Sequence, residues 1–164
     1  MPPLELEKYF AGKTKSWGVI EDRFGKAQDE FTAELIGEQR GEVFHLDQRF
    51  TYASGKKQHR LWEIRRLDGH SYEATATDIQ GKAKAWIEGS AVHLQYTLAV
   101  PLGNRRVNVQ FNQWMWRQPD GVLFNRVDVR KFGVRVARVS EFFQKQNAQL
   151  TTTGPWQAVE PRHR

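Results

Sequence analysis

The chain has 164 residues, enough for one domain with a sizeable core, and 39% of them are hydrophobic, which excludes a disordered chain. It contains no cysteine, which excludes a disulfide framework, a thiolate nucleophile and a cysteine-based metal site. The formal net charge is +6, but the basic residues form only short runs near turns, and this favours a solvated basic surface over a nucleic-acid interface.

The first predicted element is a short helical segment over residues 4–10, LELEKYF. Leu6, Tyr9 and Phe10 share one face of a helix, and Gly12 ends it after one or two turns. We expect this segment to close one end of the structure that follows.

From Trp17 onward apolar residues recur at every second position, which is the period of a β-strand. This period predicts strands over residues 17–23, 28–38, 43–52, 58–67, 72–78, 82–88, 92–100 and 134–145, with a long hairpin over 107–133. The hairpin turns at Pro119-Asp120-Gly121, where proline pre-sets φ and glycine accepts a positive φ. The cleanest apolar row runs from Val92 to Val100.

Short links between about ten strands predict an all-β fold with sequential antiparallel pairing. A sheet of that size exposes two edges unless it closes, so we expect a single closed or nearly closed up-and-down barrel. A two-sheet sandwich is the alternative. We expect the barrel domain over residues 1–146, and residues 147–164, which lose the period, predict an irregular C-terminal tail.

A barrel of ten strands is wider than one that its own side chains fill, so an internal cavity is expected. Space would be left by small residues on neighbouring strands: Ala74, Ala76, Ala83 and Ala85. We interpret these bulky residues as core: Phe44, Phe50, Tyr96, Leu98 and Phe142. Three tryptophans fit either the core or the wall of a ligand cavity: Trp62, Trp86 and Trp114.

Residues that carry chemistry are scattered along the chain. No two histidines have metal-ligand spacing, and neither a Gly-x-Ser-x-Gly elbow nor a glycine-rich phosphate loop occurs. We therefore predict no metal site, no cofactor and no catalytic nucleophile. Asp22, Asp78 and Asp128 are candidate general bases because they lie in otherwise patterned strands.

The pair Asn125-Arg126 interrupts an apolar strand. Neighbouring strand residues face opposite sides, so one of the two points inward in either phase. A buried arginine needs a carboxylate partner, for which Asp22 and Asp78 are candidates, or an anionic ligand. We favour the internal salt bridge; in the functional alternative, Arg126 binds the head group of a fatty-acid-like molecule whose apolar chain lies in the barrel.

A series of short motifs runs in a fixed order along residues 4–145. They are LELEKYFAGKTKSWGVIEDRFGK, Arg60-Leu61-Trp62-Glu63-Ile64, Asp78 with Gly81 and Ala83, Tyr96, Pro101, Trp114-Met115, Asp120-Gly121-Val122, Asn125-Arg126, Lys131-Phe132-Gly133 and Phe142-Phe143. In this order they resemble the bacterial domain-of-unknown-function family numbered 3833, whose members are often described as lipoproteins. The resemblance implies a calycin-like barrel, in the company of lipocalins and fatty-acid-binding proteins, with no established activity. At the position of the acidic residue that usually precedes the Trp-Met pair this chain has Asn112, with Gln113 following, and the lipobox cysteine is missing.

We expect a non-enzymatic barrel that binds a small hydrophobic or amphipathic ligand, such as a lipid or fatty acid. The expected contacts are Trp17, Asp22, Trp62, Trp114, Asn125 and Arg126. One alternative is an enzyme acting on a hydrophobic substrate, with Asp22 or Asp78 as base and Arg126 as electrostatic stabiliser. The other is a filled barrel that serves as a structural or interaction module. No nucleic-acid partner is expected, because an oligonucleotide-binding fold uses five strands.

No stretch of the sequence approaches the ~20 apolar residues of a membrane helix, and MPPLELEKYF lacks the apolar region of a signal peptide. The sequence as it stands predicts a cytoplasmic protein without an integral membrane segment. A periplasmic or membrane-anchored lipoprotein that has lost its leader is the alternative. The oligomeric state stays open.

Overall fold

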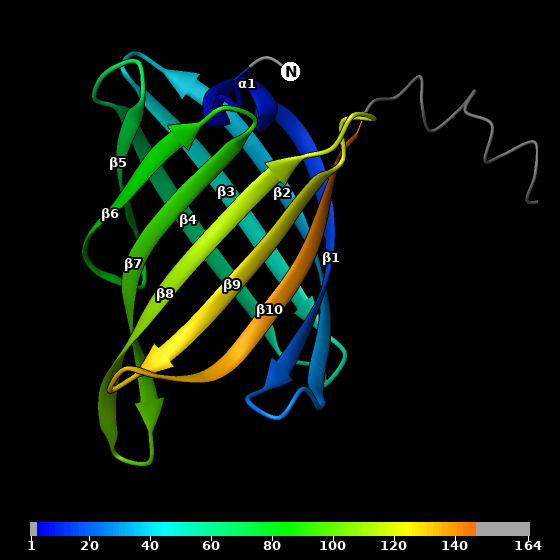
Figure 1. Cartoon of the computed structure of the whole chain (residues 1–164), viewed down its shortest axis with the longest axis vertical. Helices are drawn as coiled ribbons and strands as arrows, with labels where there is room; N and C mark the ends of the chain where they lie inside the picture. Colours follow the sequence, from blue (N-terminus) through cyan, green and yellow to red (C-terminus); the bar gives the residue numbers. More distant parts are fainter. Residues whose placement is uncertain (1–2, 147–164) are drawn as a thin grey trace, which may run out of the picture.

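The computed structural model of the protein describes residues 3–146, which form one helix and ten strands. The helix is α1 (Leu6–Tyr9), and the strands are β1 (Gly12–Asp22), β2 (Ala27–Arg40), β3 (Val43–Tyr52), β4 (Lys57–Arg66), β5 (Ser71–Ala76), β6 (Ile79–Glu88), β7 (Ala91–Leu102), β8 (Arg105–Arg117), β9 (Leu123–Lys131) and β10 (Val134–Lys145). Each strand pairs antiparallel with its sequence neighbours, and β1 pairs with β10 (Figure 1). The predicted closed up-and-down barrel is confirmed and the sandwich is excluded. The predicted tail, residues 147–164, lies outside the described residues.

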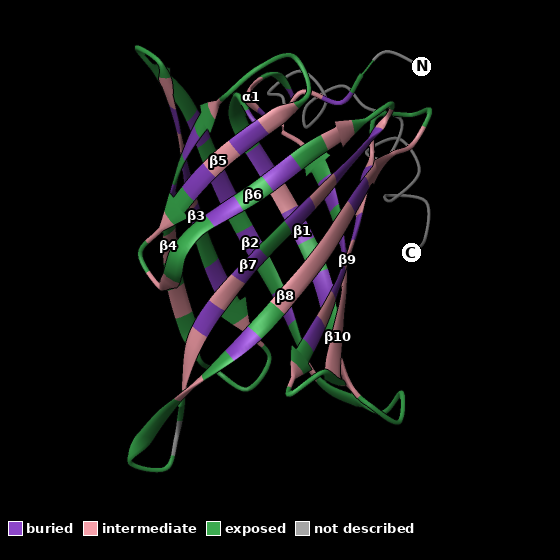
Figure 2. Cartoon of the chain, turned by 60° about the vertical axis from the view of Figure 1, so that its left-hand side comes forward, coloured by how far each residue is buried: buried purple, intermediate pink, exposed green. Residues whose placement is uncertain are grey.

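Alternation of apolar and polar residues sets which face of each strand turns inward. On β2, Phe31, Ala33 and Leu35 are buried, whereas Thr32 and Glu34 between them are exposed. Figure 2 shows the same banding of buried and exposed residues along most strands. The inward rows form one continuous core inside the barrel.

The first strand is longer than its apolar pattern indicates, because its early inward residues are polar. Thr14 and Ser16 are 2% and 0% exposed, and they hide the period of a strand that begins at Gly12. β1 and β10 pair from Thr14 opposite Lys145 to Asp22 opposite Ala137. This seam removes both sheet edges.

The core prediction for Phe142 is wrong. Its side chain is 49% exposed, and its neighbour Phe143 is the buried one at 2%. Adjacent strand residues cannot share a face, and the inward row of β10 includes Glu141 beside Phe143. A charged residue on the inner row concealed the phase of the strand.

The helix α1 lies across one end of the barrel (Figure 1). Arg66 at the end of β4 binds it through two carboxylates, with Nη2 2.8 Å from Glu5 Oε1 and Nε 2.9 Å from Glu7 Oε2. The buried Tyr72 donates its hydroxyl proton to Glu7 at 2.6 Å and accepts the Leu6 backbone N–H at 3.1 Å. Within residues 3–146, no helix has the length and hydropathy that crossing a bilayer requires.

Candidate ligand cavity

The barrel encloses a cavity of about 580 Å³. That volume is within the range of small-molecule sites, roughly 300–1,000 Å³. Small inward residues on neighbouring strands leave part of this space, because Ala74 on β5 and Ala85 on β6 both line it. The expected internal cavity is thus present, and two of the four small residues named for it line it, whereas Ala76 and Ala83 do not.

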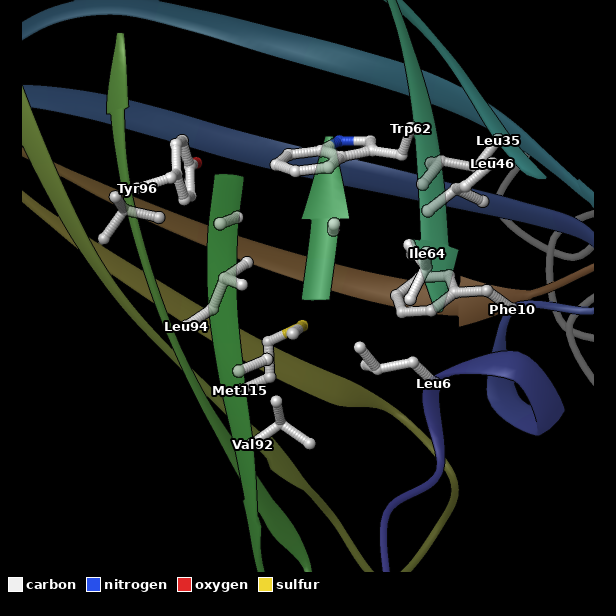
Figure 3. Packing of buried hydrophobic residues seen from close by; sticks show 14 of the residues in the cluster. Leu6, Phe10, Leu35, Leu46, Trp62, Ile64, Val92, Leu94, Tyr96 and Met115 are labelled. Atoms are coloured by element: carbon white, nitrogen blue, oxygen red, sulfur yellow. The ribbon is translucent and has the colours of Figure 1, made fainter. Parts of the chain in front are cut away.

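The walls of the cavity are mainly apolar. Trp62 stands edge-on to Tyr96, with ring centroids 5.4 Å apart, and Figure 3 shows the two rings meeting inside the barrel. Leu6 and Phe10 reach in from α1 and close that end. Further apolar lining comes from Phe31, Leu46, Ile64, Leu94, Leu98, Met115, Val127 and Val139.

One wall carries a chain of hydrogen-bonded polar groups. The Tyr96 hydroxyl donates to Gln113 Oε1 at 3.1 Å, and Gln113 Nε2 donates to Asn125 Oδ1 at 2.8 Å. Asn125 Nδ2 donates to Glu141 Oε1 at 3.0 Å, and Ser16 Oγ donates to Glu141 Oε2 at 2.7 Å. We call these five residues, from β7, β8, β9, β10 and β1, the polar wall. Asn125 lies directly opposite Glu141 in the register of β9 and β10, and the other members are offset by two residues from their hydrogen-bond partners on the neighbouring strand.

Glu141 is the electrostatic centre of the polar wall. Burial raises the pKa of its carboxyl to about 7, against hydrogen bonds from Ser16 and Asn125 that lower it. The group therefore changes its protonation state near neutral pH. It can accept a hydrogen bond when ionised and donate one when protonated.

A second polar group lies farther from α1. Arg60 makes a forked contact with Asp78, with Nε 2.9 Å from Oδ1 and Nη2 2.9 Å from Oδ2. Gln58 Nε2 donates to the same carboxylate at 3.3 Å, and the Tyr52 hydroxyl donates to Gln58 Oε1 at 3.0 Å. The Arg60 guanidinium also lies 5.7 Å from the ring centroid of Phe50. The charge of this inward arginine is thus balanced by Asp78.

The cavity extends to the end of the barrel opposite α1. There its lining includes Lys56, Pro101 and Arg106, all of which are exposed to solvent. The lining residues are exposed at this end and buried beneath α1, so the cavity opens to solvent at the end opposite α1. We call the barrel end around Lys56, Pro101 and Arg106 the mouth.

The family described as "Protein of unknown function (DUF3833)" matches residues 1–145 of the chain. The chain belongs to this family. The resemblance inferred from the order of the sequence motifs is therefore confirmed. No curated protein matches the chain.

Two solved structures share the barrel. The S-type phycobiliprotein lyase CPES from Guillardia theta is 6% identical, with a TM-score of 0.61 over 86% of this chain and 90% of that one. A protein of unknown function from the DUF3598 family of Nostoc punctiforme is 12% identical, with a TM-score of 0.59 over 89% of this chain and 51% of that one. At such identities the likeness concerns the fold alone.

The structure brings two of the six expected contact residues to the cavity, Trp62 and Asn125. Trp62 Nε1 donates to Gln48 Oε1 at 2.7 Å, and Asn125 belongs to the polar wall. Of the pair Asn125-Arg126, it is therefore the asparagine that faces inward.

The other four expected contacts lie away from the cavity. Trp17 is 41% exposed on the outer face, and Trp114 stacks on His93 there at 4.3 Å between centroids. Arg126 lies over Trp116 at 5.2 Å. Asp22 holds the turn after β1 by accepting the backbone N–H groups of Phe24 and Lys26.

These positions also bear on the alternatives. The internal salt bridge that we expected for Arg126 is formed by Arg60 with Asp78 instead. Asp78 lies inside the barrel while Asp22 and Arg126 lie outside, so the groups of the enzyme alternative do not converge. Within residues 3–146, no cluster of three or more histidine or acidic side chains is placed to hold a metal ion.

Three polar residues of the cavity, Arg60, Gln113 and Glu141, are not among the contacts expected from the sequence. A signal existed for two of them, because Arg60 shares the phase of Trp62 and Ile64, and Glu141 shares the phase of Phe143. A charged residue on the apolar phase of a barrel strand indicates an inward polar group. Gln113 shares the phase of Phe111 and Met115, but Trp114 and Trp116 lie on the opposite phase, so the pattern of this strand does not tell which face is inward.

Proposed function

We propose that the protein is a non-enzymatic barrel that binds one small amphipathic molecule in its interior. The observation that carries the proposal is the cavity of about 580 Å³, which is mainly apolar and is polar at the polar wall and around the Arg60–Asp78 pair. Cavities of this kind bury an apolar body and orient it with a few hydrogen bonds.

The apolar part of the ligand would lie against Trp62, Leu94 and Met115, between α1 and the polar wall. Trp62 is held in place by Gln48 and by its edge contact with Tyr96. A fixed aromatic surface costs little conformational entropy on binding, which favours a rigid or stretched apolar body.

The polar part of the ligand would meet Glu141, Gln113 and Asn125. Arg60 is neutralised by Asp78, so an anionic head group would have to displace that carboxylate. An uncharged group that donates and accepts, such as a hydroxyl or an amide, fits the polar wall without that cost. We therefore favour an uncharged lipid-like ligand over a fatty-acid anion.

Probe displacement tests the proposal and the preferred head group together. The full-length protein is mixed with an environment-sensitive fatty-acyl probe, and a long-chain alcohol competes against the fatty acid of equal length. We expect the alcohol to displace the probe at lower concentration. Native mass spectrometry of the purified protein should also show co-purified ligand. An empty protein that binds no probe at micromolar concentration contradicts the proposal.

A pair of variants on one strand provides the control. Ala74→Phe fills the cavity, whereas Thr75→Phe adds the same ring on the exposed face of β5. We expect probe binding to weaken about tenfold or more for the first, about 1.4 kcal/mol, and to stay unchanged for the second. Ala85→Leu, a smaller filling change on β6, is measured beside them in case the larger ring disturbs folding.

A further inference from the structure

Two phenylalanines are displayed at the mouth end of the barrel. Phe24 in the β1–β2 turn is 82% exposed and Phe132 in the β9–β10 turn is 87% exposed, the highest values for large hydrophobic residues in the described chain. Both turns lie at the barrel end opposite α1, and Figure 2 shows this end as mainly exposed. Exposed aromatic tips at one end indicate an interaction surface rather than packing.

The backbone of Phe132 has a conformation that is unfavourable for phenylalanine. Its φ is 52° and that of Gly133 is 78°, the left-handed pair of a two-residue hairpin turn, where asparagine is the usual first residue. Phenylalanine rarely adopts this conformation. The turn thus holds a large ring in solvent at a position that favours a small polar residue.

Basic side chains surround both rings. The guanidinium of Arg23 lies 5.1 Å from the ring centroid of Phe24, and the Lys131 ammonium lies 5.4 Å from that of Phe132. Further cations of this end are Lys26, Lys56, Lys57, Arg105, Arg106 and Arg130, and Arg135, opposite Arg130, is paired with Asp128 at 3.9 Å. Among the described residues, the eight cations other than Arg135 form no ion pair, whereas Arg66 and Lys8 at the α1 end are paired with glutamates.

We propose that this mouth end docks on an anionic lipid bilayer. Phe24 and Phe132 enter the interface beside the lipid head groups, and the surrounding lysines and arginines contact the phosphates. Lys56 and Arg106 belong both to this basic end and to the cavity lining, so docking turns the mouth toward the bilayer. The docking rests on these exposed residues and does not depend on the ligand proposed above.

Aromatic and basic residues also occur together in single-strand nucleic-acid sites. Those sites arrange aromatic rings as stacking platforms along a groove. Here the two rings stand on separate, neighbouring turns, since β1 pairs with β10, and neither has another aromatic ring within stacking distance among the described residues. That arrangement suits shallow insertion into a bilayer, as isolated tips do.

Vesicle flotation tests the docking with the full-length protein. Vesicles of equal parts phosphatidylglycerol and phosphatidylcholine should carry the protein, and vesicles of phosphatidylcholine alone should not. High salt should weaken the binding, because exposed charges are screened. Equal binding to both vesicles, or binding to neither, overturns the proposal, and so does tight binding to single-stranded DNA without vesicle binding.

Matched variants locate the surface. Replacing Phe24 and Phe132 by alanine should weaken binding to the anionic vesicles by about tenfold or more, since two aromatic anchors are lost. Leu67→Ala removes a residue that is 59% exposed in a turn at the α1 end and should change nothing. Similarly, Lys26→Glu with Arg105→Glu should abolish binding, while Lys13→Glu with Arg65→Glu should leave most of it. Equal losses in the matched pairs contradict the docking surface.

A fluorescent label gives a second readout. The chain has no cysteine, so Phe132→Cys or Leu67→Cys places one thiol-reactive, polarity-sensitive dye at a known position. We expect a blue shift on anionic vesicles for the dye at 132 and none for the dye at 67. Shifts of the same size at both positions refute an oriented dock.

Discussion

At the scale of single residues, the protein is defined by polar groups on an apolar inner face. Glu141 is 5% exposed, yet it keeps two hydrogen-bond donors, Ser16 and Asn125. Satisfied polar groups in a low-dielectric interior are tolerated and orient whatever enters the cavity. The free-energy cost of burying Glu141 depends on pH, because the pKa of its carboxyl is raised to about 7.

We predict that Glu141→Gln removes a pH dependence of stability. Burial raises the Glu141 pKa from 4.5 to about 7, so the folded state binds the proton more tightly than the unfolded chain. The resulting stability is present below pH 4.5 and is lost as the pH rises through 7, about 3 kcal/mol in all. The glutamine variant should therefore gain stability relative to the wild type between pH 5 and pH 8.

Urea denaturation at the two pH values measures this gain. Glu34→Gln on the exposed face of β2 removes one carboxylate without touching the polar wall, and it controls for net charge. If both variants show the same difference between the two pH values, Glu141 does not titrate as a buried acid.

At the scale of elements, α1 fits its barrel end so closely that one strand position must be glycine. A Cβ at Gly37 on β2 would overlap the Phe10 carbonyl oxygen and the Phe44 ring. A Cβ at Gly18 on β1 would overlap only the ring of Phe31, which borders the cavity. The first contact involves backbone, and the second involves a side chain with space beside it.

We predict that Gly37→Ala destabilises the protein by about 3 kcal/mol and Gly18→Ala by about 1 kcal/mol. The alanine at 37 has to push α1 off the barrel end, whereas the alanine at 18 can push Phe31 into the cavity. Guanidinium denaturation gives the two free energies, and Gly18→Ala should in addition weaken probe binding. Equal losses of unfolding free energy in the two variants would contradict the close packing of α1 against Gly37.

At the scale of the whole molecule, closure between β1 and β10 makes the last strand indispensable. β10 contributes Glu141 and Phe143 to the interior, and its pairing with β1 extends to Lys145. The helix α1 is bound to the barrel from two sides. Arg66 on β4 donates to Glu5, and the Tyr9 hydroxyl donates to the Gly121 carbonyl at 2.8 Å. We therefore expect the barrel to unfold as one cooperative unit.

We predict that the barrel ends where β10 ends. A chain terminated after Gln146 should unfold at the same denaturant concentration as the full chain, because every pair along the β1–β10 seam is kept. A chain terminated after Val139 should show no cooperative transition, since it loses six of the nine residue pairs of the seam and both inward side chains. A marked loss of stability in the longer chain would place residues 147–164 in the fold.

The outer surface explains why part of the interior escaped prediction. A row of stacked or tilted aromatic rings runs over β6 to β10 on the outside of the barrel: Trp86, His93, Trp114, Trp116, Phe124 and Phe142. Cross-strand aromatic pairs stabilise a sheet even where they are half exposed. On these strands both faces therefore carry apolar residues, and the two-residue period does not show which face turns toward the interior of the barrel.

The sequence by itself determined the ten strands, their order, the closed barrel and the presence of an internal cavity. These follow from turn residues, strand period and the cost of open sheet edges, all of which are local or topological. Only the tertiary structure decided that Asn125 and Gln113 face the cavity and that Arg126 lies outside. The reason is that β8 and β9 carry apolar residues on both faces, so their sequences do not show which face turns inward. That choice depends on the register with which each strand pairs with its neighbours, and the register exists only in the assembled barrel.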